Sequence, residues 1–437
     1  MRTIRGVIVT SPRILAALIA AATLAAFAVT TASARPQAAP NPPARLGAVA
    51  FTSARHSGQP ASGRLATVAF TDTRHGYGLF TAQHRGRCRA EVGVTSDGGR
   101  RFTRPAVVTG WSCDDDSPAT TLAAGQRGDV FLFGPALFTS QDGGRAWHRA
   151  RPGGPVLALA AAGRSAWALV ARCHGHGQPT GQLTGQRTGQ RTGQCPVRLI
   201  VSANGGRTWQ AARLPGASVP SLGGQPAGPA ELVRTSARTA YVLTSPGPAS
   251  RLWITRDGGA SWTRRPVPCG LEAMSAALAV APDGTIVVVC AGEPSAGGQV
   301  KTLAWSADGG RTWTVHRPCR TASGSVCAPL GYGYLGQIAA PAGRTVFLAG
   351  ARSSLLVTRD GGRAWNLVRP VIGDSGGGTG ALAFFGQAGR ASQAAQASQA
   401  SQDGVVFGYD SRHNERPAIW HTADGGAHWR VVYPVLT

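Results

Sequence analysis

The sequence has little charge and almost no lysine. Charged residues make up 15% of its 437 positions, and Lys301 is the single lysine. Basic residues number 44 against 20 acidic ones, so arginine carries nearly all of the formal net charge of +24. The arginines are scattered and form no basic run, which argues against a specific nucleic-acid partner. Two interpretations of the charge remain: a composition biased toward arginine, or attraction to an anionic surface.

Long apolar runs are scarce, and the one that stands out lies near the N-terminus, at residues 14–29. It is preceded by three arginines, Arg2, Arg5 and Arg13. It has about 16 residues, fewer than the roughly 20 that span a bilayer, and Ala32-Ser33-Ala34 fits a cleavage site. We therefore expect a signal peptide at residues 1–34 and a Pro/Gly-rich tether at 35–64, with an uncleaved N-terminal anchor as the alternative. No transmembrane span is expected after signal removal, and the protein is predicted to be secreted or associated with the cell envelope.

The cysteines are not arranged for zinc or redox chemistry, because none belongs to a C-x-x-C pair. An even number in an exported chain favours disulfides, although eight cysteines allow 105 connectivities. The disulfide candidates are Cys88, Cys113, Cys173, Cys195, Cys269, Cys290, Cys319 and Cys327. A Cys173–Cys195 bridge would close the base of a Thr-Gly-Gln repeat at residues 180–194, which we interpret as a loop. A second low-complexity segment, residues 391–402, is interpreted in the same way.

Glycine and proline are abundant, at 60 and 29 residues, and many of the glycines belong to one repeated motif. The motif is Ser or Thr, any residue, Asp, Gly, Gly, two residues and an aromatic, and it occurs seven times. Its third position is Asp97, Asp142, Asn204, Asp257, Asp308, Asp360 and Asp424 in chain order. Its aromatic is Phe102, Trp147, Trp209, Trp262, Trp313, Trp365 and Trp429.

The residue types of this motif predict a tight turn. A carboxylate accepts hydrogen bonds from the backbone N–H groups of its own turn, and the hydroxyl two residues earlier can join it. The glycine pair supplies positive φ, and the aromatic is expected to pack down and anchor the turn. Apolar runs flank each motif, such as residues 199–201 and 355–357, so the motif is predicted to connect two strands as a hairpin.

A second pair of apolar runs lies upstream of each turn, for example 66–70 with 76–80 and 278–281 with 285–290. Each unit of about 50 residues therefore contains four short strands. Radial packing of seven such units predicts an all-β fold, a seven-bladed β-propeller with four-stranded blades, over residues 65–437. Counting along the blades places all eight cysteines on the face that carries the blade-to-blade crossings.

The seven turns resemble Asp-boxes, also called BNR repeats, which occur in sialidases, sortilin-type receptors, some glycan hydrolases and the photosystem II assembly factor family. The resemblance covers roughly residues 65–437. It implies that the turns are structural and lie away from the central site. The alternative is that the box carboxylates form a metal-binding ring, which their radial separation disfavours.

No catalytic set stands out. The Phe/Tyr-Arg-Ile-Pro signature of sialidases is missing from the first blade, and the five glutamates form no pair with a tyrosine. Asp114, Asp115 and Asp116 could bind calcium through carboxylate oxygens, or could form a solvated acidic loop. His174 and His176 could bind a metal, or could belong to a polar loop.

We therefore expect no cofactor and no catalytic residue. The predicted function is a secreted, non-enzymatic binding scaffold for an unknown protein or glycan. An exo-acting glycosidase of sialidase type and an envelope assembly factor remain as alternatives. The side chains around the propeller axis are expected to distinguish a sialidase from a binding scaffold. Three arginines with a Tyr–Glu pair would favour a sialidase, whereas an uncharged ring would favour protein or peptide binding.

Overall fold

The fold contains only strands in the residues that can be described. The computed structural model describes residues 63–84, 87–112, 120–125, 128–173, 192–222, 225–228, 230–244, 250–270, 273–294, 298–317, 333–350, 354–368, 372, 379–385, 403–410 and 416–436. These ranges contain 31 strands, and no helix within them is long and apolar enough to cross a membrane. The all-β class predicted from the sequence is confirmed.

Seven antiparallel sheets follow one another along the chain, and we number them blades 1 to 7. Blade 1 consists of β1 (Arg64–Phe70), β2 (Gly76–His84), β3 (Arg87–Thr95) and β4 (Arg101–Val107). Blade 2 consists of β5 (Thr121–Ala124), β6 (Val130–Phe133), β7 (Leu137–Ser140) and β8 (His148–Ala150). Blade 3 consists of β9 (Val156–Ala162), β10 (Ser165–Ala171), β11 (Thr192–Ser202) and β12 (Gln210–Ala212).

The remaining four blades repeat this order. Blade 4 consists of β15 (Ala230–Arg234), β16 (Ala240–Thr244), β17 (Arg251–Thr255) and β18 (Thr263–Pro266). Blade 5 consists of β19 (Ser275–Val280), β20 (Ile286–Ala291), β21 (Lys301–Ser306) and β22 (Thr314–His316). Blade 6 consists of β23 (Ile338–Ala342), β24 (Thr345–Leu348), β25 (Leu356–Thr358) and β26 (Asn366–Leu367). Blade 7 consists of β27 (Thr379–Phe385), β28 (Asp403–Asp410), β29 (Arg416–Thr422) and β30 (Arg430–Val432).

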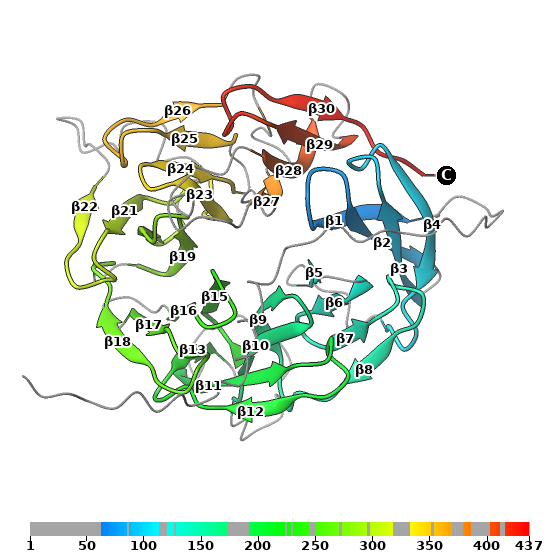
Figure 1. Ribbon diagram of the computed structural model, residues 1–437, viewed down its shortest axis with the longest axis horizontal. Helices are drawn as coiled ribbons and strands as arrows, with labels where there is room; N and C mark the ends of the chain where they lie inside the picture. The colour runs from blue at the N-terminus through cyan, green and yellow to red at the C-terminus, as the bar shows by residue number, and fades with distance from the viewer. Residues whose placement is uncertain are drawn as a thin grey trace, which may run out of the picture. The chain divides into compact units, whose positions relative to one another are not determined.

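The blades are arranged in a closed ring, with the first strand of each nearest the axis (Figure 1). We call β1, β5, β9, β15, β19, β23 and β27 the axial ring. Each of these strands contacts the next, and β27 contacts β1, which closes the circle. The chain therefore folds as a seven-bladed β-propeller, as predicted.

Seven clusters of buried side chains fill the spaces between neighbouring blades. Leu79 of blade 1 and Leu132 of blade 2 share one cluster, and Phe80 of blade 1 and Phe407 of blade 7 share another. The other five clusters join blades 2 to 7 in succession. Because both faces of a blade are covered, second strands such as β6 are buried along their whole length and appear as continuous apolar runs.

The turns of the seven motif copies, which we call box turns, share one hydrogen-bond pattern. In each, the Ser or Thr hydroxyl donates to Oδ1 of the Asp or Asn at 2.7–3.0 Å. The same hydroxyl accepts the N–H of the second glycine at 2.8–2.9 Å. Oδ1 also accepts the backbone N–H four residues later, at 2.9–3.1 Å. Both glycines have φ between 69° and 98°, which confirms the conformation predicted for the pair.

Each box turn also rests on the preceding blade. The box aromatic belongs to the cluster between its own blade and the one before, as Trp209 does against Phe131, with ring centroids 6.3 Å apart. The predicted anchoring is therefore made across a blade boundary. Phe102, Trp147 and Trp429 are buried, whereas Trp209, Trp262, Trp313 and Trp365 are only partly buried.

The ring is closed where blade 7 meets blade 1, and we call this joint the seam. A last strand, β31 (Val435–Leu436), pairs in parallel with β4 at the outer edge of blade 1. The Val435 N–H donates to the Arg100 carbonyl at 2.9 Å. Nearer the axis, the Tyr409 hydroxyl donates to the Leu65 carbonyl at 3.1 Å.

The sheet of blade 3 has two more strands than the four predicted from the sequence. Two strands, β13 (Ser218–Leu222) and β14 (Gln225–Pro226), extend its sheet beyond the first half of β11. Residues 192–194, expected to end a loop, instead begin β11 and pair with β13. That expectation was wrong. The segment is polar and shows no strand pattern of its own, but β13 supplies the backbone partner with which it pairs. Residues 180–191 and 391–402 lie outside the described residues.

Two disulfides join described cysteines, Cys173 to Cys195 and Cys269 to Cys290. The first is the bridge predicted from the sequence. Cys88 is also disulfide-bonded, and no described cysteine is free. The other three candidates, Cys113, Cys319 and Cys327, lie outside the described residues, as do residues 1–62.

Candidate functional site

The axial ring carries very little charge. Among its described side chains, the charged ones are Arg64, Glu231 and Arg234. The others are mostly alanine, leucine and valine, as in β9 with the sequence VLALAAA and β19 with SAALAV. Many of these apolar side chains are buried between blades, and several partly exposed side chains of the ring, such as Ala123, Leu157 and Ala160, are also small or apolar.

Glu231 is the single carboxyl group of this ring within the described strands. It lies in β15 opposite Leu243 and is partly buried. Val233, two residues on and therefore on the same face, packs against the cluster between blades 4 and 5. Burial raises the pKa of Glu231 to about 7, so this carboxyl group can hold or release a proton near neutral pH.

The two arginines of the axial ring contact neighbouring blades. The Arg64 guanidinium lies 4.4 Å from the centre of the Tyr409 ring. Arg234 donates to the Ser165 carbonyl at 3.0 Å and lies 4.6 Å from the Trp167 ring centre. Burial lowers the pKa of Arg234 to about 10. The described axial ring therefore has no cluster of three arginines of the kind that a sialidase-type site needs.

The box carboxylates are held inside their own turns. The hydrogen bonds of these turns lower the pKa of Asp142, Asp257, Asp308, Asp360 and Asp424, which favours the ionised form. Each box lies in a different blade, and no group of three or more His, Cys, Asp or Glu side chains in the described residues could hold a metal ion. The calcium candidates Asp114, Asp115 and Asp116, and the histidines His174 and His176, lie outside the described part of the chain.

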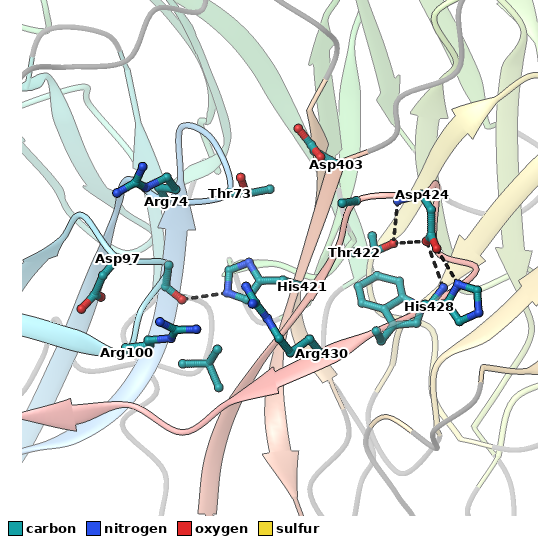
Figure 2. Close-up of a pocket in the computed structure, with 14 residues that line it drawn as sticks. Thr73, Arg74, Asp97, Arg100, Asp403, His421, Thr422, Asp424, His428 and Arg430 are labelled. Atoms are coloured by element: carbon teal, nitrogen blue, oxygen red, sulfur yellow. Dashed lines mark hydrogen bonds and ion pairs between the residues drawn. The ribbon is translucent and has the colours of Figure 1, made fainter.

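A pocket of about 640 Å³ opens at the seam, on the face that carries the box turns. Its lining comes from the turns of blade 1, including Arg74 and Arg100, and from blade 7, including His421 and Arg430 (Figure 2). The volume is within the usual range of small-molecule sites. The pocket takes residues from both turns of blade 1 on this face, Thr73 and Arg74 from the turn between β1 and β2, and Asp97, Gly98 and Arg100 from the box turn.

His421 lies at the centre of this lining and joins the two blades. It is 8% exposed, and its Nε2 lies 2.7 Å from the Gly98 carbonyl of the blade 1 box. A carbonyl only accepts, so Nε2 carries the proton and donates. Burial lowers the pKa of His421, and the positive charges of Arg430 and Arg100 lower it further. The ring is therefore neutral near pH 7, with two guanidinium groups beside it (Figure 2).

No motif in the sequence predicted the seam pocket, and His421 and Arg430 were not among the candidate site residues. A signal was present, because both depart from the residue types at the same positions of the other six repeats.

Comparisons with known proteins identify no family for the chain. No family model matches the chain, and neither does any curated protein. Similar solved structures include YCF48 from Cyanidioschyzon merolae, with 17% identity, 86% of this chain and 97% of that chain covered, and a TM-score of 0.45. An ancestral GH74 enzyme shares 13% identity over 86% of this chain and 46% of its own, with a TM-score of 0.43. The structure titled "NanB plus Optactamide" shares 11% identity over 86% and 70%, with a TM-score of 0.39.

Proposed function

We propose that the chain is a secreted, non-enzymatic β-propeller that binds a protein or glycan partner at its axis. The composition of the axial ring carries this proposal, because its described side chains are mostly small and apolar. Glycoside hydrolysis generally uses two carboxyl groups placed on either side of the scissile bond. The described axial ring offers one, Glu231.

Export is part of the proposal. The signal peptide at residues 1–34 and the tether at 35–64 would deliver the propeller, residues 65–437, outside the cytoplasm. The Cys173–Cys195 and Cys269–Cys290 disulfides support an oxidising compartment. We propose a structural role for the seven box residues, because their side chains are bonded within their own turns.

A glycosidase of sialidase type is the second candidate, and Glu231 is the observation that favours it. A carboxyl group with a pKa of about 7 is suited to donate a proton to a leaving group. The second carboxyl group that a glycosidase generally uses would have to come from residues beyond the described strands of the axial ring.

Turnover assays separate the two candidates. Wild-type protein and Glu231→Gln should be assayed between pH 5 and 8 on sialosides and common aryl glycosides, after equal thermal melting shows that both are folded. We expect no hydrolysis by either protein. Hydrolysis by the wild type that disappears in Glu231→Gln would establish the glycosidase and reject the scaffold.

A further inference from the structure

The seven repeats provide an internal reference for what the fold requires. In every blade, the residue three before the box Asp or Asn pairs across strands with the residue six after it. In blades 1 to 6 these pairs are Val94 with Thr103, Thr139 with His148, Val201 with Gln210, Ile254 with Thr263, Trp305 with Thr314, and Val357 with Asn366. None of the six contains an arginine, so the turn folds without one.

The seventh pair is His421 with Arg430, and it lies at the seam pocket. The blade 1 box adds Arg100 from the other side of the seam. At these two positions none of the other six blades has an arginine, and the one other imidazole is His148 of blade 2. His421 and Arg430 therefore bring an imidazole and a guanidinium together only where the ring closes. The fold gives no reason for Arg430, because threonine occupies its position in three other blades.

The arginines of this pocket are available to a ligand. Arg100 and Arg430 are exposed, and their side chains have no ion pair or hydrogen bond within the described residues. Three carboxylates, Asp97, Asp403 and Asp424, also line the pocket, and the two box carboxylates are hydrogen-bonded within their own turns. Asp97 accepts from Thr95 and from the Arg101 N–H, and Asp424 lies 2.6 Å from His428 Nδ1.

We propose that Arg430 and Arg100, beside the neutral ring of His421, form an oxyanion site in the seam pocket, which binds a small ligand bearing a phosphate or sulfate group. Guanidinium groups match the oxygen geometry of these anions and bind them with paired hydrogen bonds. The pocket volume of about 640 Å³ exceeds that of a bare anion and leaves room for an organic part of the ligand. This site lies on the box-turn face and does not depend on the partner proposed for the axis.

The test is calorimetric titration of the full mature protein at low salt with inorganic phosphate, inorganic sulfate and a hexose phosphate. The neutral hexose serves as the blank. We expect both inorganic anions and the hexose phosphate to bind, and the neutral hexose not to bind. Tighter binding of the hexose phosphate than of inorganic phosphate would identify an organic ligand, and equal binding would identify the free anion.

Two variants place the binding in the pocket. Arg430→Thr introduces the residue that blades 1, 4 and 5 have at this position, so it should fold normally. Arg363→Ala removes the same charge from an exposed box turn in blade 6, away from the seam. We expect Arg430→Thr to weaken binding by roughly tenfold or more and Arg363→Ala to change it by less than about twofold. Equal weakening by both variants, or no binding of any anion to the wild type, would overturn the proposal.

Discussion

At the residue scale, the second glycine of each box meets two requirements at once. It has a positive φ, and it lies against a side chain of the preceding blade. A Cβ on Gly426 would overlap the Phe347 ring, and a Cβ on Gly362 would overlap Leu303. The sequence predicted the first requirement from the turn motif. The second could not be predicted, because it depends on how closely neighbouring blades approach.

Gly426→Ala should therefore destabilise the protein more than Gly258→Ala. Both positions have φ near +80°, which costs an alanine about 1–2 kcal/mol, but a Cβ on Gly258 meets nothing within 4 Å. Overpacking against the buried Phe347 ring should add about 1–3 kcal/mol for Gly426→Ala. Urea unfolding measures both changes. Equal losses of stability would show that the blades do not pack on the second glycine.

Glu231 should make stability depend on pH. Its pKa is raised in the folded protein from an ordinary 4.5 to about 7, so the unfolded chain releases this proton at lower pH than the folded one. The free energy of unfolding should fall by up to about 3 kcal/mol as pH rises from 4.5 to 7. Glu231→Gln should lose this part of the slope. An unchanged slope in the variant would assign the pH dependence to other groups.

At the scale of elements, each box hairpin joins its blade to the one before it. The sequence predicted the hairpins, since the turn residues and flanking strands are local. It did not indicate which blade the aromatic would contact. β13, β14 and β31 were also missed, because they are short and their pairing partners are supplied by the folded ring.

The box aromatics differ in burial, and we therefore expect their substitutions to differ in the stability lost. Phe102→Ala should cost about 3–5 kcal/mol, because Phe102 is completely buried at the seam. Trp313→Ala should cost less, since Trp313 is partly exposed. Arg311→Ala, an exposed change beside Trp313, should stay within about 0.5 kcal/mol. Denaturant unfolding compares the three, and a larger loss for Trp313→Ala than for Phe102→Ala would contradict the packing described.

At the scale of the whole molecule, seven copies of one motif were enough to predict a closed ring. They were not enough to locate a site. Which inner-strand side chains surround the axis depends on the packing of all seven blades, and the seam pocket exists only after the ring has closed. Arg74 and Arg100 meet His421 and Arg430 across more than 300 positions of sequence. The sequence pattern of a single repeat does not predict which residues of the first and last blades lie close together.

The net charge also belongs to this scale. The single lysine, Lys301, is fully buried and donates to the carbonyls of Gln299 and Gly333 at 3.0 and 2.8 Å. Arginine therefore supplies the positive charge of the described surface. Contacts made by exposed charges are screened over about 10 Å at 0.1 M salt, so adhesion to anionic polymers should fade as salt rises.

Retention of a partner at increasing salt tests the central claim, that the axis is a binding surface. The tagged propeller is used to capture binders from an extract of its cell envelope, in parallel with Ala66→Glu and Ala260→Glu. Ala66 is exposed on axial strand β1, and Ala260 is exposed in the blade 4 box turn. We predict one partner that stays bound above the salt concentration that removes unspecific binders, because apolar contacts are not screened. Ala66→Glu should release it and Ala260→Glu should not. Binding that is lost entirely at moderate salt, or is unaffected by Ala66→Glu, would contradict the claim.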